Sequence, residues 1–402
     1  MLFLIKIGEK AMKGRIAILT GGGDVPGLNP AIRAITEGSL ALSHEVIGIR
    51  RGWHGLVNYV PDDSADNSSF ITVLNQIIVG KASRTGGTIL HTSRTNPSNL
   101  SQENVPAHLA SKYQVEKNDI TPEILKNLEH LGIEHLIVIG GDDTLSYGKR
   151  LSDEGVKVIG IPKTMDNDVP GTDYCIGFST CVSRTIEYVN QLRTTAGSHE
   201  RILVVEVFGR YAGFTALAPA AAGVCDRCLI PESSFDVERL TELLVFDRNN
   251  NPSRYAVVLV SEGAKLSNSM EFENGDLDEY GHKKLGGIGD KIAYILRKNS
   301  PRYNKGHEIN TISQRLGYLV RSGVPDALDS TIPAIFGIKA IRLIEKGIQG
   351  VLINFCRGIV SYTSIEIVTG QRKQVDVSKY YDPGQYKPIT GVSLLPLATI
   401  EG

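Results

Sequence analysis

The chain has 402 residues, enough for two or three domains, and its 41% hydrophobic content allows large buried cores. Lys and Arg number 43 against 44 Asp and Glu, so a net charge of -1 gives no sign of a nucleic-acid-binding surface. No apolar run is long enough for a membrane span, and the odd cysteine count of five, without a recognisable secretory signal, indicates free thiols. We therefore expect a cytoplasmic protein without nucleic-acid or membrane partners.

Short apolar runs alternate with helix-length amphipathic stretches along the chain. The run at 15–20 predicts a buried strand, and 30–42 predicts the helix that follows it. Further strands are predicted at 45–50, 135–139, 156–161, 201–207, 228–230 and 255–260. Strands separated by helices imply right-handed crossovers and parallel sheets, which is the α/β class. The polar stretch 268–286 is expected to be a surface excursion.

The first predicted strand runs directly into Gly21, Gly22, Gly23 and Asp24. Glycines at the carboxyl end of a strand allow backbone N–H groups to approach an anion, and the next helix adds a favourable dipole. The spacing matches neither the Walker nor the Rossmann fingerprint. A phosphate-binding turn and a merely tight turn both remain open.

A second strand, 135–139, ends in Gly140, Gly141, Asp142, Asp143 and Thr144. Open α/β sheets place their ligands at this edge. A carboxylate there is a natural anchor for Mg²⁺, which prefers one or two carboxylates together with substrate phosphates. A solvated acidic turn is the alternative.

A third strand leads into Lys163, Thr164, Met165, Asp166 and, two residues later, Asp168. A cation, a hydroxyl and two carboxylates lie within six residues, and this mixture suits phosphoryl transfer. The lysine can neutralise phosphate, the threonine can hydrogen-bond it, and one carboxylate can accept a hydroxyl proton. The alternative is a polar loop with an Asx turn.

Together these segments resemble, in chain order, the motifs of the phosphofructokinase family, and the similarity covers about residues 13–350. The matching stretches are GGGDVPGLNPAIR, GGTILHTSR, IGGDDTLS, GIPKTMDNDVPGTDYCIGFSTC, GSHERILVVEVFGRYAG and LGYLVRSG. NAD kinases and diacylglycerol kinases share the GGD element but lack the TMDND and FGR elements.

The resemblance implies two Rossmann-like three-layer α/β/α domains with mostly parallel sheets. The expected divisions are a larger domain at 1–177 with the donor and Mg²⁺ site, a smaller domain at 178–325 with the sugar-phosphate site, and a C-terminal segment at 326–402 packing back across both. It also implies a phosphotransferase that phosphorylates the 1-hydroxyl of fructose 6-phosphate, in glycolysis and in reverse, and that forms a homodimer or homotetramer.

On the donor side, the resemblance assigns donor-phosphate contacts to Gly22, Arg94 and Gly141. Asp142 resembles the residue that binds the Mg²⁺ cofactor. Asp143 and Lys163 resemble residues that act both on the donor and in catalysis.

On the sugar side, Asp166 resembles the base that takes the proton from the sugar hydroxyl. The other positions are assigned to substrate binding, with Thr164 and Arg210 also acting in catalysis: Thr164, Met165, Arg201, Phe208, Gly209, Arg210, Glu262, Tyr318 and Arg321. Phe208 replaces the methionine of the family motif, and Ile312 stands where many relatives carry an arginine that reaches across a subunit interface.

The choice of donor depends on two positions where ATP-dependent members usually carry glycine. Asp143 would repel the α-phosphate of a nucleotide, at about 1–4 kcal/mol for like charges in contact at effective dielectrics of 80 to 20. Lys163 adds a charge that can hold the terminal phosphate of a short donor. Repulsion of one ligand combined with attraction of another is a common route to specificity. The pair resembles the pyrophosphate-dependent branch.

Three alternatives remain at this stage. One is an ATP-dependent 6-phosphofructokinase. The second is a catalytically inactive, sugar-phosphate-binding regulatory subunit, against which the presence of Asp142, Asp166 and Arg210 argues. The third is a NAD or lipid kinase that shares only the GGD element.

Overall fold

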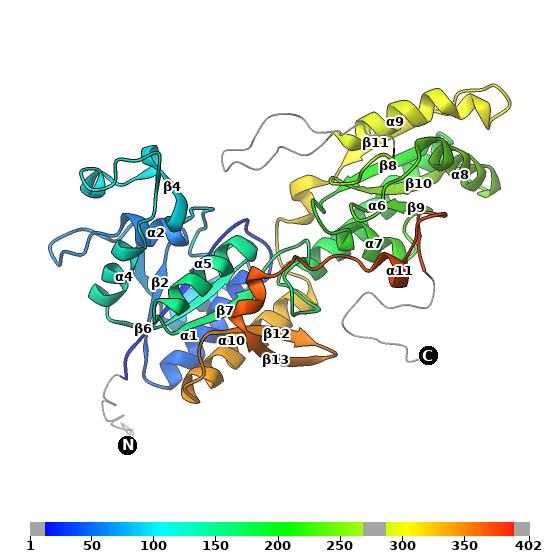
Figure 1. Cartoon of the computed structure of the whole chain (residues 1–402). Helices are drawn as coiled ribbons and strands as arrows, with labels where there is room; N and C mark the ends of the chain where they lie inside the picture. The colour runs from blue at the N-terminus through cyan, green and yellow to red at the C-terminus, as the bar shows by residue number, and fades with distance from the viewer. Residues whose placement is uncertain (1–12, 268–286, 390–402) are drawn as a thin grey trace, which may run out of the picture. The chain divides into compact units, whose positions relative to one another are not determined.

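Residues 13–267 and 287–389 are described by a computed structural model, in which they form two units (Figure 1). Unit 1 comprises 13–162, Ser330–Ile353 and Val360–Thr369, and unit 2 comprises 163–267, 287–329, Asn354–Ile359 and 370–389. The apolar start at 1–12 and the expected excursion at 268–286 lie outside the described residues. The predicted division into 1–177, 178–325 and 326–402 was based on the sites expected in each part and not on contacts within the structure. It stays a prediction.

Unit 1 is built on a seven-stranded sheet in the order β13-β12-β7-β6-β1-β2-β3. Its strands are β1 (Arg15–Thr20), β2 (Glu45–Ile49), β3 (Ile71–Val73), β6 (Ile133–Gly140), β7 (Val158–Pro162), β12 (Val351–Cys356) and β13 (Ile359–Ser364). The pairs β1–β2, β1–β6, β6–β7 and β7–β12 are parallel, while β2–β3 is antiparallel. The central strands are buried almost throughout, as expected for a parallel sheet covered on both faces.

Parallel strands need crossovers, and helices supply them in unit 1. These helices are α1 (Leu28–Ala41), α2 (Trp53–Asn58), α3 (Gln76–Ala82), α4 (Thr121–His130), α5 (Asp142–Asp153) and α10 (Ala327–Glu345), whose first residues belong to unit 2. Shorter elements complete it: η1 (Pro97–Asn99), β4 (Leu100–Ser101), η2 (Gln102–Asn104), η3 (Ala107–Leu109), β5 (Lys117–Asn118) and η6 (Ile365–Thr369). The register aligns Thr20 with Ile139 and Gly140 with Pro162, so β1, β6 and β7 end at nearly the same level.

Unit 2 contains a four-stranded parallel sheet in the order β11-β8-β10-β9. Its strands are β8 (Ile202–Val207), β9 (Arg227–Leu229), β10 (Ala256–Ser261) and β11 (Thr311–Arg315). Its helices are α6 (Phe178–Ser198), α7 (Phe214–Ala221), α8 (Val237–Asn250), α9 (Ile288–Asn299), η4 (Ser300–Arg302), η5 (Gly317–Val320) and α11 (Val377–Tyr380). A hairpin of β14 (Tyr381–Asp382) and β15 (Lys387–Pro388) follows α11.

All eight elements predicted by range are present, with small shifts at their ends. The strand at 15–20 is found without a shift, because an apolar run bounded by glycines leaves little freedom for its ends. The strand predicted at 156–161 begins two residues later, at Val158. Eight strands of the described ranges were not predicted, namely β3, β4, β5, β11, β12, β13, β14 and β15. β11 lies at a sheet edge and carries the mixed sequence TISQR, which lacks the continuous apolar run of a central strand.

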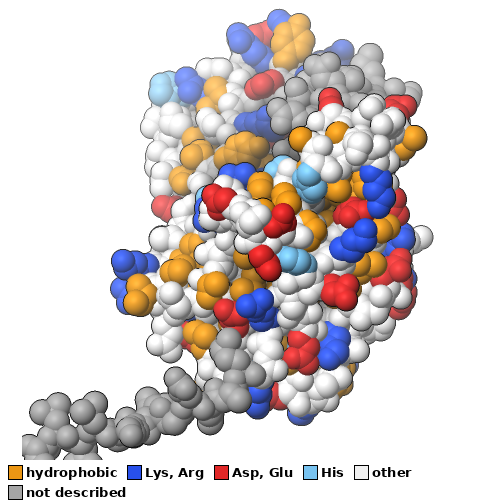
Figure 2. Space-filling view, turned by 90° about the vertical axis from the view of Figure 1, so that its left-hand side faces the viewer, with side chains coloured by type: hydrophobic (Ala, Val, Ile, Leu, Met, Phe, Trp, Pro, Cys, Tyr) orange, Lys and Arg blue, Asp and Glu red, His pale blue; other side chains and the backbone are white. Residues whose placement is uncertain are grey.

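The surface agrees with the near-neutral charge of the sequence. On the face seen in Figure 2, basic and acidic side chains are interspersed among uncharged and hydrophobic ones. All five cysteines are free thiols. No helix within the described ranges combines the length and apolar character that crossing a membrane requires.

Candidate active site

Two glycine-rich turns of unit 1, at the ends of β1 and β6, pack against the same buried side chain. The Gly21 N–H donates to the carbonyl of Ile139 at 3.0 Å. A Cβ atom at Gly21 would lie 2.5 Å from Thr144 Cγ2, and one at Gly140 would overlap the same threonine. Any other residue would push the two turns apart, so the glycines are required by close approach.

Gly22 joins this turn to the segment that carries Arg94. Its φ of 78° favours glycine, its N–H donates to the Ser93 carbonyl at 2.8 Å, and its own carbonyl accepts the Thr92 hydroxyl at 2.6 Å. The N–H groups of Gly21 and Gly22 therefore bond within the protein rather than pointing to a ligand. The donor contacts expected of Gly22 and Arg94 stay predictions.

Asp142 and Asp143 form the first turn of α5, directly after Gly141. Acidic side chains are favourable there because the first N–H groups of a helix carry partial positive charge. Asp142 is half-buried and Asp143 is exposed. No cluster of three or more His, Cys, Asp or Glu with metal-site geometry occurs in 13–267 and 287–389. A half-buried carboxylate such as Asp142 fits Mg²⁺, which completes its coordination with substrate phosphates and water.

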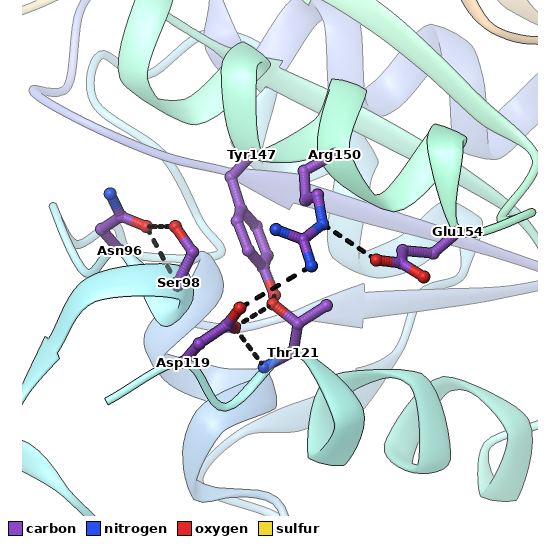
Figure 3. Close-up of polar contacts among 7 residues, drawn as sticks. All are labelled: Asn96, Ser98, Asp119, Thr121, Tyr147, Arg150 and Glu154. Carbon is purple, nitrogen blue, oxygen red and sulfur yellow. Dashed lines mark hydrogen bonds and ion pairs between the residues drawn. The ribbon is translucent and has the colours of Figure 1, made fainter. Parts of the chain in front are cut away.

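A polar network formed by Tyr147 and Arg150, which follow the first turn of α5, fixes this helix in unit 1 (Figure 3). The Tyr147 hydroxyl donates to Thr121 Oγ1 at 3.1 Å, and Thr121 in turn donates to Asp119. Arg150 donates to Glu154 at 2.9 Å and lies 3.7 Å from Asp119. α5 is thus tied to the start of α4, which holds the two aspartates at its N-terminus in place.

Arg50, which follows β2, was missed by the sequence reasoning. Its Nε is shielded from solvent and has no hydrogen-bond partner among the described residues, while its Nη2 lies 3.0 Å from His91 Nε2. The His91 carbonyl accepts the Thr20 hydroxyl at 2.9 Å, so this cation stands at the same sheet edge as the Gly21 turn. The signal was present, because Arg50 ends the strand predicted at 45–50 and a second arginine, Arg51, follows it.

In unit 2, the loop that carries Asp166 is held in shape by its own side chains. Asn167 has a φ of 55°, and its amide accepts the Cys175 N–H and donates to the Asp173 carbonyl, both at 2.9 Å. The Asp166 N–H donates to Thr164 Oγ1 at 3.2 Å. Lys163 and Met165 alternate inward and are buried, at 4% and 8% exposure. The loop therefore presents Thr164 and Asp166 on one side.

Asp166 has the surroundings of a proton acceptor. Its Oδ1 is shielded from solvent and has no hydrogen-bond partner among the described residues. Burial, and then the charges of Asp168 and Glu262, raise the pKa of Asp166 well above its ordinary value. A carboxylate with a raised pKa and an unused acceptor atom is suited to take a proton from a hydroxyl.

The loops after β8 and β10 bring Arg210 and Glu262 together. The Glu262 N–H donates to the Val207 carbonyl at 2.9 Å, and the Gly263 N–H donates to the Gly209 carbonyl at 3.2 Å. Gly209 has a φ of 120°, and a Cβ there would lie 2.8 Å from the Ala212 carbonyl oxygen, which only glycine tolerates. Burial raises the pKa of Glu262, against the opposing charges of Arg210 and Arg315.

Three further predicted residues meet in unit 2. The Phe208 and Tyr318 rings are 6.3 Å apart in an edge arrangement, and the Arg321 guanidinium lies 5.0 Å from the Tyr318 ring centre. Arg315, which the sequence did not assign to this site, lies 3.2 Å from Glu206 and 3.9 Å from Glu262. It adds a second cation beside Glu262.

Arg201 is not brought to this group. It precedes β8, whereas Phe208, Gly209 and Arg210 follow it, and six extended residues span about 20 Å at roughly 3.3 Å each. Its Nε is shielded from solvent without a hydrogen-bond partner among the described residues. The strand predicted at 201–207 separates Arg201 from Arg210 within one chain, and the assignment of Arg201 to substrate binding stays a prediction.

Unit 2 thus holds two buried carboxylates with raised pKa values and two arginines near Glu262, while unit 1 holds two glycine turns and the half-buried carboxylate of Asp142. These are the parts that phosphotransferases use to move a phosphoryl group.

Comparisons with known proteins identify the family. The phosphofructokinase family description matches residues 15–344. The chain is 36% identical over 372 residues to a pyrophosphate–fructose 6-phosphate 1-phosphotransferase of Dictyoglomus thermophilum, covering 92% of this chain and 97% of that protein. It is 37% identical over 364 residues to ATP-dependent 6-phosphofructokinase 2 of Clostridium perfringens, covering 90% and 93%. The chain belongs to the phosphofructokinase family.

A solved structure agrees at the level of the fold. The pyrophosphate-dependent phosphofructokinase from Marinobacter aquaeolei aligns with a TM-score of 0.69 at 19% identity, covering 94% of this chain and 89% of that one. The predictions of the family, of the α/β fold class and of a phosphotransferase are therefore confirmed.

Proposed function

We propose that this protein transfers a phosphoryl group from pyrophosphate to the 1-hydroxyl of fructose 6-phosphate, reversibly and with Mg²⁺. The observation that carries the donor choice is the pair Asp143 and Lys163. Asp143 is exposed at the first turn of α5, where it can repel a bulkier nucleotide, and Lys163 is 4% exposed, so its charge is poorly screened. Relatives named for pyrophosphate and for ATP are about equally similar, so similarity does not choose the donor.

In the proposed reaction Asp166 accepts the proton of the sugar 1-hydroxyl. The hydroxyl oxygen forms a bond to the transferred phosphorus as the bond from that phosphorus to the leaving phosphate breaks. Arg210 and Lys163 stabilise charge on the migrating group, and Thr164 hydrogen-bonds it. The contacts among Arg210, Glu262 and the Phe208–Tyr318–Arg321 group support sugar-phosphate binding by these residues.

The residues assigned to the donor by the family resemblance all lie in unit 1, apart from Lys163. Gly22, Gly141 and Arg94 would line the donor phosphates, and Asp142 would hold Mg²⁺. When bound, the ion would neutralise phosphate charge and orient the leaving group. Arg50 is a further candidate for the donor phosphates, since it lies at the same sheet edge and its Nε has no hydrogen-bond partner in the part of the chain that the structure describes.

The proposed assembly is a homodimer or homotetramer. Arg201 lies at the opposite end of β8 from Arg210, so a contact between Arg201 and the sugar phosphate would require a second copy of the chain. The cytoplasmic location remains an expectation from the sequence.

A donor comparison tests the proposal. Purified protein is assayed for fructose 1,6-bisphosphate formation with pyrophosphate and with ATP, and we expect pyrophosphate to be preferred. The double variant Asp143→Gly/Lys163→Gly should move the ratio towards ATP by about tenfold or more, since removing the repulsion releases about 1–4 kcal/mol.

Matched controls are Asp153→Gly on the same helix and Lys157→Gly, both of which change exposed charges. They should leave the donor ratio unchanged. Equal turnover of the wild-type protein on both donors would contradict the donor choice. Binding of fructose 6-phosphate without turnover on either donor would favour the regulatory-subunit alternative.

A further inference from the structure

Residues 372–375, called the strap here, lie against the loop that carries Asp166. The Lys373 N–H donates to the Asp168 carbonyl at 2.9 Å, and its ammonium donates to the Thr172 carbonyl at 2.7 Å. The same ammonium lies 5.2 Å from the ring centre of Phe214, the first residue of α7. One lysine from the C-terminal part of the chain thus bonds to the Asp166 loop at two places.

The other side of the strap meets the loop that carries Arg210. Gln374 donates to the Tyr211 carbonyl at 3.0 Å, and the Arg372 guanidinium lies 4.3 Å from the Tyr211 ring centre. The Val375 N–H donates to Glu232 Oε1 at 2.8 Å, and the same oxygen accepts the Gly213 N–H at 3.0 Å. The strap therefore bonds to both loops within unit 2.

The chain that follows anchors the strap firmly. Tyr381 is 1% exposed, and its hydroxyl donates to the Cys228 carbonyl at 2.8 Å. The Cys228 N–H in turn donates to the Tyr386 carbonyl at 2.8 Å. These bonds fasten the β14–β15 hairpin to β9, so the strap is held at a fixed edge of the sheet of unit 2.

The strap also brings charge to a group of carboxylates. Asp168 and Asp173 and the thiols Cys175 and Cys356 face the Lys373 ammonium, and burial lowers the pKa of that lysine despite them. Asp168 and Glu262 in turn raise the pKa of Asp166. A fixed cation beside Asp168 offsets part of the negative charge gathered around Asp166.

We propose that the strap sets the spacing between the Asp166 loop and the Arg210 loop, and that Lys373 is a positioning residue for Asp166. The inference rests on the proposed function for its kinetic consequences. The two loops come from separate parts of the chain, and the strap is a third part that bonds to both of them. A small displacement between reacting groups is enough to slow an enzymatic reaction substantially.

The variant Lys373→Met tests the proposal, because methionine keeps the stem and removes the charge and the donor. We expect kcat to fall by about tenfold with KM for fructose 6-phosphate changed by less than about twofold. The acid limb of the kcat/KM profile should move to higher pH, because loss of a nearby cation raises the pKa of Asp166, which is faced by Asp168, Glu262 and Arg210. Lys373→Arg should recover part of kcat.

Two comparisons guard against a merely structural loss. Lys379→Met changes an exposed lysine of the same C-terminal segment and should leave kcat and the pH profile unchanged. Gln374→Ala removes the bond to the Tyr211 carbonyl from an exposed position and should lower kcat about threefold, through the Arg210 loop alone. Equal effects of Lys373→Met and Lys379→Met would overturn the proposal.

Hydrogen exchange supplies a readout that does not need activity. In Lys373→Met, peptides covering 164–177 and 208–214 should exchange faster than in the wild-type protein, while peptides of β10 should not change. Unchanged exchange in both loops would overturn the proposal whatever the kinetics show. If the wild-type protein transfers phosphate from neither donor, the proposed function fails, and the exchange result still decides whether the strap holds the two loops.

Discussion

The loops that carry the candidate site residues are held in place differently in the two units. In unit 1, glycines at the ends of β1 and β6 pack on Thr144, and the residues predicted to meet the donor follow within a few positions. In unit 2, buried carboxylates and arginines on separate loops are held by side-chain hydrogen bonds and by the strap. The first arrangement is steric and local, and the second is electrostatic and assembled from distant parts of the chain.

This difference teaches where each unit is vulnerable. A steric site fails when a side chain is added, because packed atoms cannot give way. An electrostatic site fails when a charge or an acceptor is removed, because its partners remain buried and unsatisfied. Single substitutions can therefore separate the two kinds of construction, and the largest effects are expected in unit 2.

Replacing Asp166 by Asn should have the largest effect. Asparagine keeps the shape of the side chain but cannot accept the hydroxyl proton, so kcat should fall by about 10²–10⁴-fold while KM for fructose 6-phosphate changes much less. In the wild-type enzyme, the raised pKa of Asp166 should place the acid limb of the rate profile at higher pH than an ordinary aspartate would. Steady-state kinetics across pH measure both.

Asp226→Asn is the matched control, because burial also raises the pKa of this carboxyl, which accepts the Val257 N–H in the same unit. It should reduce stability without lowering kcat. An undiminished kcat in Asp166→Asn would mean that another group accepts the proton, and the account of unit 2 would need a different base.

Asp329 supplies the next largest effect, on stability rather than rate. Its buried carboxylate accepts hydrogen bonds from Tyr174, Gly177 and Thr180, and it caps the start of α6 from the first turn of α10. Asparagine can accept on one side only, so Asp329→Asn should lower the stability of unit 2 by about 1–3 kcal/mol. Thermal unfolding monitored by calorimetry measures the loss.

The pH dependence of that loss follows from burial, which raises the pKa of Asp329 to about 6. Between about pH 4 and pH 6 the folded state binds a proton that the unfolded state has lost, so wild-type stability falls as pH rises through this window. Asparagine has no such fall, so the gap in Tm between wild type and Asp329→Asn should be wider near pH 5 than near pH 7.5. Asp290→Asn, at an exposed position, should show a small gap that does not change with pH, and a pH-independent gap for Asp329→Asn would contradict the assignment.

The same contrast explains what the sequence could predict. The strand at 15–20 and the loops after it were predictable, because an apolar run followed by glycines determines local structure without distant partners. The chemical groups of the loop that carries Asp166 could be predicted from the sequence. The contacts that hold this loop in place could not. Lys373 reaches Thr172 across 201 positions and Asp329 reaches Thr180 across 149, and no local pattern encodes such contacts.

The arginines differ in how far the sequence could place them. Arg50 is the last residue of the strand predicted at 45–50, and its place at the same sheet edge as the glycine turns follows from parallel pairing. Arg201 lies at the other end of β8 from Arg210 within one chain, and its assignment to substrate binding stays a prediction. The edge strand β11 had no apolar run to reveal it, so Arg315, at its end, could not be placed beside Glu206 and Glu262.

A smaller effect is expected from adding one methyl group in unit 1. In Gly21→Ala the new Cβ would lie 2.5 Å from Thr144 Cγ2, so the β1 and β6 turns must separate, at about 1–3 kcal/mol. We expect KM for the phosphoryl donor to rise by about fivefold or more, with KM for fructose 6-phosphate little changed. The double variant Gly21→Ala/Thr144→Ala should recover much of the donor affinity, because it removes the atoms that collide.

Gly80→Ala is the matched control and the smallest effect, with the opposite sign. Gly80 lies inside α3, is exposed, and has no atom within 4 Å of its Cβ position, so alanine adds helix propensity without collision. Tm should rise by about 1–3 °C with both KM values unchanged, since alanine gains about 1 kcal/mol over glycine in a helix. If Gly80→Ala raised the donor KM as much as Gly21→Ala does, close packing on Thr144 would not be the reason that Gly21 is needed.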